Sequence, residues 1–139
     1  GFTDYPLVAG TSTIKAVHIT ELRTRINTLR GGCGLSTYSF TDSTLTAGST
    51  TARAVHLADL RTALSQAYVA CGQTAPTYTD ATLTAGSTVI KAVHIAELRA
   101  TTAKPSFLGS KFFKLNEKKD RATFYCVCEE IFHFSEGTL

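Results

Sequence analysis

One motif recurs three times in this chain at a constant spacing. Residues 90–99 read IKAVHIAELR, and residues 14–23 and 52–61 read IKAVHITELR and ARAVHLADLR. The successive copies are 38 residues apart. A fixed period of this length is typical of repeat proteins, in which each repeat is one supersecondary unit. The period therefore constrains the fold more than any other feature of the sequence.

The repeat divides the chain into three units and a tail. The array covers residues 2–103, with units at 2–39, 40–77 and 78–103, and residues 104–139 do not follow the pattern. Each unit opens with an aromatic residue, a threonine and an aspartate, and a glycine followed by hydroxyl residues precedes the motif. We expect one of these hydroxyls to accept from a backbone N–H at a helix N-cap.

The motif and the residues after it have helical periodicity. Ile19, Leu22, Ile26 and Leu29 are spaced at i, i+3, i+7 and i+10, which is the spacing of one helix face. Glycines predict that the first helix ends near residues 31–32 and the second before Gly72. The third helix should end near Thr102, because Pro105 cannot continue it.

The tail has a different pattern. Two apolar stretches, residues 111–115 and 121–128, flank a polar segment at 116–120, which predicts a β-hairpin. The expected fold is therefore mainly α: three 38-residue helix-plus-long-loop repeats packed as a small array, with a short C-terminal β-hairpin.

Each long loop needs an anchor. Loops of roughly fifteen residues are long for a compact domain, and an arginine at the end of each motif can form a bidentate pair with a carboxylate. We predict an aspartate–arginine pair, within a repeat or between repeats, that holds each loop. The predicted anchors are Asp4, Arg23, Asp42, Arg61, Asp80 and Arg99.

A histidine and an acidic residue stand three positions apart in every motif. The pairs are His18 and Glu21, His56 and Asp59, and His94 and Glu97. Three histidines can form a zinc site, but stacked units hold equivalent residues roughly 10 Å apart. We therefore expect each histidine to pair with a carboxylate or with the preceding loop, and we expect no metal and no cofactor.

The sequence does not favour catalysis. Serine, histidine and aspartate are all present, but no Gly-x-Ser-x-Gly nucleophile elbow accompanies them. The Gly-rich residues 31–34 follow a predicted helix and do not open one, which excludes a phosphate loop. We expect a protein that is not an enzyme.

Four cysteines allow disulfides. Cys33 and Cys71 occupy equivalent positions in adjacent units, and a bond between them requires converging helix ends. We predict this pairing first; the alternatives are a bond from either residue to Cys126 or Cys128, or four free thiols.

Composition points to a secreted protein. The chain has a low charged fraction of 18%, many hydroxyl residues and no methionine or tryptophan. Its net charge of +3 gives no nucleic-acid footprint, and no apolar run is long enough for a membrane span. Because the chain begins with Gly1 and then the first residues of a repeat, we expect a mature or excised piece, so the missing signal peptide does not argue against secretion.

The unit FTDxxLxAGSTxIKAVHIxELR resembles a tandem module of large secreted or surface-attached bacterial proteins. The resemblance covers residues 2 to about 100. More loosely, the aromatic-x-Asp opening and the basic-Ala helix entry resemble the S-layer homology domain, although this repeat is shorter and lacks a second helix. The resemblance implies an extracellular spacer or display element.

Three functions follow from these observations. The first is a non-enzymatic structural module of a bacterial surface or filament protein, whose partners are other copies or other surface domains. The second is a module that binds cell-wall glycan or another carbohydrate. The third is a metal-dependent enzyme that uses the histidine and carboxylate set, which we regard as the weakest.

Overall fold

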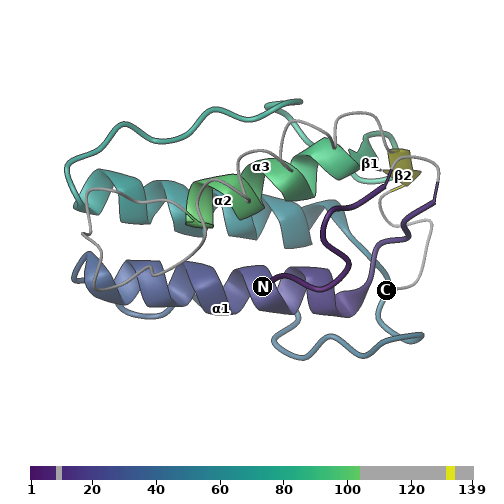
Figure 1. Ribbon diagram of the computed structural model, residues 1–139, viewed down its shortest axis with the longest axis horizontal. Helices are drawn as coiled ribbons and strands as arrows, with labels where there is room; N and C mark the ends of the chain where they lie inside the picture. The colour runs from purple at the N-terminus through teal and green to yellow at the C-terminus, as the bar shows by residue number, and fades with distance from the viewer. Residues whose placement is uncertain (9–10, 104–130, 134–139) are drawn as a thin grey trace.

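The protein is mainly helical in the part of the chain that the computed structural model describes, residues 1–8, 11–103 and 131–133. The elements are α1 (Ala16–Gly32), α2 (Ala54–Ala70), β1 (Val89–Lys91), α3 (Ala92–Ala103) and β2 (Ile131–His133). Each helix contacts the other two, and Figure 1 shows them side by side along the long axis, with the long loops outside. The loops are thus held against helices that share one core.

The repeated apolar positions form that core. Leu22, Leu60 and Leu98 are equivalent residues of the three motifs, and all three are 0% exposed. Ile26 and Leu29 continue the buried stripe along α1, as the helical spacing predicts. Each such leucine contributes about 2 kcal/mol by leaving water. Equivalent residues of the three motifs therefore form the centre of the core.

The helices begin differently from the prediction. The N-cap residues of α1 and α2 are Lys15 and Arg53, and neither makes a side-chain cap hydrogen bond. The predicted hydroxyls act earlier, within the loops. Ser12 Oγ accepts from the Val8 N–H at 2.7 Å, and an equivalent bond of 2.8 Å occurs within each of the later two loops. The serines and threonines therefore stabilise a turn and leave the helix start to another residue, the motif histidine.

The helix ends agree with the glycine signal. Cys33 and Cys71 follow α1 and α2, and the next residues, Gly34 and Gly72, have φ values of +80° and +76°. The Leu35 N–H then donates back to the Arg30 carbonyl at 2.9 Å, which is the long bond of a Schellman motif. Glycine is needed there because this backbone region disfavours residues with a Cβ.

The disulfide that we predicted first from the sequence is present. Cys33 and Cys71 are bonded, with their Cα atoms 5.2 Å apart, because the ends of α1 and α2 converge. Cys126 and Cys128 lie outside the described residues, as do Pro105 and the hairpin predicted at residues 111–128.

Polar side chains also join neighbouring helix ends. Arg30, buried near the end of α1, donates to the Ala63 carbonyl of α2 at 2.9 Å. Tyr68, the equivalent residue of α2, donates its hydroxyl to the Thr101 carbonyl of α3 at 2.8 Å. The same position thus makes the same type of contact with the next helix, although the residue type differs.

A short antiparallel pairing joins the third unit to the tail. β1 precedes α3, and Ile90 of β1 stands opposite Phe132 of β2. α3 ends at Ala103, close to the end predicted from Pro105.

A small apolar cavity lies where the three units meet. Equivalent residues of the units line it, and at one of them an alanine replaces an isoleucine. The lining includes Ile14, Ala52, Ile90, Ile19, Leu57 and Ile95. Ala52 is 2% exposed and borders this cavity, which has a volume of about 10 Å³.

Ala52→Val should raise the free energy of unfolding by about 1 kcal/mol, because the added methyl groups bury apolar surface in this space. Urea unfolding followed by circular dichroism measures the change. The matched control is Ala63→Val, at an alanine that is 0% exposed and does not line the cavity. That variant should lose stability through overpacking. Equal losses in both variants would show that the cavity does not accept the larger side chain.

Candidate functional site

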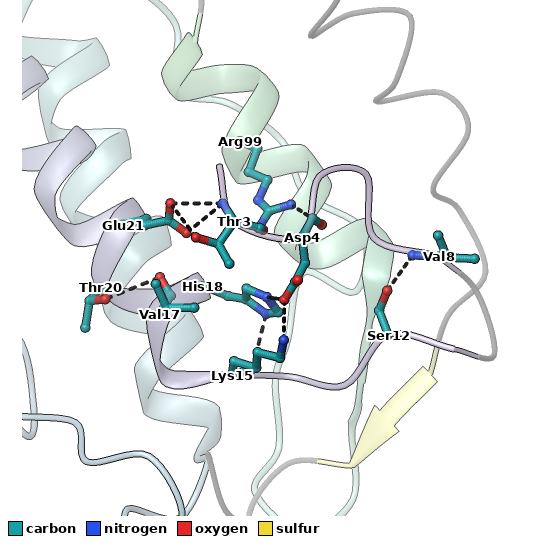
Figure 2. Close-up of polar contacts among 10 residues, drawn as sticks. All are labelled: Thr3, Asp4, Val8, Ser12, Lys15, Val17, His18, Thr20, Glu21 and Arg99. Carbon is teal, nitrogen blue, oxygen red and sulfur yellow. Dashed lines mark hydrogen bonds and ion pairs between the residues drawn. The ribbon is translucent and has the colours of Figure 1, made fainter. Parts of the chain in front are cut away.

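The candidate site residues gather in three equivalent groups, which we call anchor clusters. Each cluster holds the Thr-Asp pair of one loop between the histidine and acidic residue of the following helix and the arginine of another helix. Figure 2 shows the first cluster, with Asp4 above His18, Glu21 beside Thr3, and Arg99 reaching in from α3.

The histidine caps its own helix and binds the loop aspartate. In the first cluster, the Nδ1 atom of His18 accepts from the Lys15 N–H at 3.2 Å, and its Nε2 atom lies 2.9 Å from Asp4 Oδ2. A backbone N–H can only donate, so Nδ1 is unprotonated and Nε2 carries the hydrogen given to Asp4. The imidazole therefore replaces the Glu or Gln of an ordinary capping box.

The other two histidines repeat this arrangement. His56 Nε2 lies 2.7 Å from Asp42 Oδ2 and its Nδ1 accepts from the Arg53 N–H at 3.1 Å. For His94, the corresponding distances to Asp80 and to the Lys91 N–H are 2.8 and 3.0 Å. All three rings are buried. Each pairs with a carboxylate, as predicted, and the carboxylate is that of the loop aspartate.

The loop aspartates have an unusual backbone. Asp4, Asp42 and Asp80 have φ values of 51°, 53° and 54°, in the left-handed region that aspartate and asparagine tolerate better than other residues with a Cβ. This conformation turns the loop where its carboxylate meets the histidine. Aspartate thus supplies both the turn and the acceptor.

A cation beside each carboxylate completes its partners. Lys15 Nζ lies 2.8 Å from Asp4 Oδ2 and Lys91 Nζ lies 3.0 Å from Asp80 Oδ2, and Arg53 pairs with Asp42. Hydrogen bonds from the lysine and then the histidine lower the pKa of the Asp4 and Asp80 carboxyls. For Asp42, the hydrogen bond from His56 is the larger cause of the lowered pKa, followed by that from Arg53.

The acidic residue of each motif holds the loop threonine. The Thr3 N–H donates to both carboxylate oxygens of Glu21, at 3.0 and 3.1 Å, and Glu97 receives Thr79 in the same way. In the second cluster, Asp59 accepts from the Thr41 N–H at 2.7 Å. Histidine and acid therefore share one helix face because both face the same loop.

The motif arginine joins different units. Arg23 donates to the backbone carbonyls of Thr41 and Asp42 at 2.7 and 2.8 Å, and Arg61 donates to those of Thr79 and Asp80 at the same distances. These bonds run from each unit to the next one along the chain.

The third arginine continues the pattern across the length of the chain. Arg99 donates to the carbonyls of Thr3 at 2.8 Å and Asp4 at 3.5 Å. The bonds of the third unit therefore return to the first.

The predicted bidentate arginine–carboxylate pair is corrected by these contacts. The residues predicted as anchors do meet, but each guanidinium binds two main-chain carbonyls, while the aspartate carboxylate binds histidine. The physical reason is that the buried Nε2–H also needs an acceptor. Each guanidinium also stacks on the aromatic residue that opens the held loop, 4.8–5.0 Å from the ring centroid of Phe40, Tyr78 or Phe2.

Burial controls the charge of these groups. Desolvation lowers the pKa of His18 and His94, and the hydrogen bond that each ring donates to its aspartate opposes this effect. Desolvation also lowers the pKa of Arg23, Arg61 and Arg99, but a guanidinium remains charged at any ordinary pH. The first and third clusters thus combine a neutral imidazole with a charged guanidinium.

This geometry uses the histidines for structure. Both ring nitrogens of each histidine are engaged, one by a backbone N–H and one by aspartate. The three rings also serve three separate aspartates. Among residues 1–8, 11–103 and 131–133, no group of three His, Cys, Asp or Glu side chains could hold a metal ion.

Sequence reasoning missed three contributors: the loop threonine, the basic residue before the helix and Arg30. The first two recur at the 38-residue spacing, as Thr3, Thr41 and Thr79 and as Lys15, Arg53 and Lys91. Their recurrence was a usable signal. Arg30 has no such signal, because its equivalent is Tyr68.

Comparison of the chain with protein-family models, with curated proteins and with solved structures found no match. Within the described part of the chain, none of the helices combines the length and apolar character that crossing a membrane requires.

Arg61→Lys should lower the free energy of unfolding by about 2 kcal/mol, because a lysine keeps the charge but cannot reach both carbonyls with a planar fork. Chemical unfolding measures this loss. Thr62→Ala, at the exposed neighbouring position, is the control and should change stability by less than about 0.5 kcal/mol.

A double-mutant cycle identifies the arginine's partner. Asp80→Asn keeps the backbone carbonyl and tolerates the left-handed φ, so its effect should add to that of Arg61→Lys. If Asp80→Asn instead removed most of the effect of Arg61→Lys, the guanidinium would be bound to the carboxylate.

Stability should fall as pH falls below 6.5, the ordinary histidine pKa. The folded pKa of His18 and His94 is lowered, so the unfolded chain binds protons that the folded chain does not. Each of these two histidines can contribute up to about 1.4 kcal/mol per pH unit until its folded pKa is reached. Urea unfolding between about pH 7.5 and about pH 4.5 measures the slope.

His94→Asn is the matched variant for this pH dependence. It should be less stable at neutral pH and should show a smaller slope below pH 6.5. An unfolding free energy that stays constant over the range in the unsubstituted protein would contradict the neutral, backbone-bound imidazole.

Proposed function

We propose that this protein is a non-enzymatic, extracellular structural module that builds or links a bacterial surface or filament assembly. One observation carries the proposal: the residues that most resemble a catalytic set are used three times over to hold loops. In each cluster, histidine binds a helix N-terminus and an aspartate, and arginine and the acidic residue bind backbone groups. This arrangement supports a mechanical role better than a chemical one.

We further propose that the three repeats pack as a closed group of three. The arginine contacts run from unit one to unit two, from two to three, and from three to one. Closure would leave no repeat end that needs a cap, so a longer tandem protein would contain separate bodies of three repeats. Such bodies suit spacing or display.

The extracellular location rests on chemistry and on resemblance. A structural disulfide such as Cys33–Cys71 is common in oxidising compartments and rare in the cytosol of mesophiles. The repeat motif resembles modules of secreted and surface-attached bacterial proteins. The partners of such a module are other copies or neighbouring surface domains.

Surface display tests this role. The full chain is exported from a bacterium between a cell-surface anchor and an epitope tag, and a Cys33→Ser/Cys71→Ser double variant is the matched control. We expect the unsubstituted chain to present the epitope and resist added protease, and the control to be cleaved faster, because loss of a native disulfide costs about 2–5 kcal/mol. Equal cleavage of the two chains would contradict the proposal that the disulfide stabilises this module outside the cell.

Purified cell-wall sacculi separate this role from carbohydrate binding. A structural module should stay in the supernatant when sacculi are sedimented, with or without the disulfide. Retention of the oxidised chain on sacculi, reversed by soluble wall fragments, would favour the glycan-binding function instead.

A further inference from the structure

An open groove lies beside α2. It has a volume of about 700 Å³, within the range of ligand sites. Its lining includes Ser65, Gln66 and Val69 of α2 and Pro76 and Tyr78 of the following loop. Val69 is 62% exposed, one of two large hydrophobic residues with such exposure in the described part of the chain. The groove therefore offers apolar surface to solvent.

In the first unit, an aromatic side chain stands at the position of one groove residue. Pro76 corresponds to Tyr38, 38 residues earlier, and the Tyr38 ring lies 4.9 Å from the Phe40 ring and 5.3 Å from the Arg30 guanidinium. The Tyr38 N–H donates to Asn27 Oδ1 at 2.9 Å. In the first unit, an aromatic ring thus packs against Phe40, the residue equivalent to Tyr78.

In the second unit the platform remains but the ring is missing. Tyr78 corresponds to Phe40, and the Arg61 guanidinium still stacks on it at 4.8 Å. Pro76 replaces Tyr38 and Ser65 replaces Asn27, while Val69 stands where the first unit has Gly31. These three differences remove an aromatic ring, shorten a polar side chain and add apolar surface.

The groove is almost without charge, which fits the apolar ring of an aromatic ligand. Arg61 is the one charged residue among the described residues that line it, and this buried guanidinium is already engaged by Tyr78 and two backbone carbonyls. Burial raises the pKa of Tyr78 to about 12, so the platform ring stays neutral and does not oppose a phenol.

We propose that this groove binds the tyrosine side chain of an extended segment of a partner protein, in the position that Tyr38 occupies in the first unit. The ring would lie on Tyr78 and against Val69, and the phenol hydroxyl and the peptide groups would face Ser65 and Gln66. The inference goes beyond the proposed structural role, because it assigns a specific ligand to a groove formed by a single chain.

A peptide that copies residues 35–40 of this chain, Leu-Ser-Thr-Tyr-Ser-Phe with blocked ends, is the probe. It is titrated into the ¹⁵N-labelled, oxidised full chain and followed by two-dimensional NMR. We expect shifts at the amides of Ser65, Gln66, Val69 and Tyr78. The same peptide with alanine in place of tyrosine should bind at least about tenfold more weakly.

Three variants of the protein test the site and its equivalent in the first unit. Pro76→Tyr supplies the missing ring from within and should abolish the peptide shifts. Val69→Gly, which copies the first unit, should weaken binding several-fold through lost apolar contact, and it keeps the test valid if Pro76→Tyr does not fold. Tyr38→Ala should open a second site, visible as new shifts at Asn27 and Gly31.

The proposal is overturned if the tyrosine peptide causes no shift, if the alanine peptide binds as tightly, or if neither Pro76→Tyr nor Val69→Gly weakens binding. These outcomes are separate from those of the display experiment, which does not depend on the groove.

Discussion

The arginine at the end of each motif is the contact on which the packing of the units depends. Its guanidinium satisfies two adjacent main-chain carbonyls of another unit and stacks on the aromatic ring that opens that loop. The left-handed turn directs the carbonyls of the aspartate and of the preceding threonine toward the arginine. If the arginine were removed, both carbonyls would lose this donor. A hydrogen bond to a charged group contributes about 1.5–3 kcal/mol, so the fork joins units and stabilises the turn at the same time.

The histidine has the complementary task inside each unit. By accepting from the N-cap N–H and donating to the loop aspartate, it couples the start of a helix to a segment fourteen positions earlier. A carboxylate at the same position could accept but could not donate. Neutral imidazole is thus suited to this position, which explains a repeated buried histidine without catalysis.

The sequence allowed much of the fold to be predicted, since a stripe such as Ile19, Leu22 and Ile26 has a helical period and Gly72 marks a helix end. The equivalent positions of Cys33 and Cys71 placed their pairing first among several alternatives, but did not exclude the others. Atom-level choices could not be predicted. Residue types indicated that Asp and Arg would meet, but not that the guanidinium would take carbonyls, and hydroxyls near Gly48 suited a loop turn as well as an N-cap. The groove beside α2 depends on how Pro76 and Val69 lie in space, which no periodicity encodes.

The disulfide makes three similar units energetically unequal. Cys33 and Cys71 tie the ends of α1 and α2 together, whereas α3 has 12 residues against 17 in each of the other helices. Local opening draws on the parts of a fold with the fewest stabilising contacts. Amide exchange in the native state should therefore be fastest in the third unit, so that a repeated sequence encodes a graded order of unfolding.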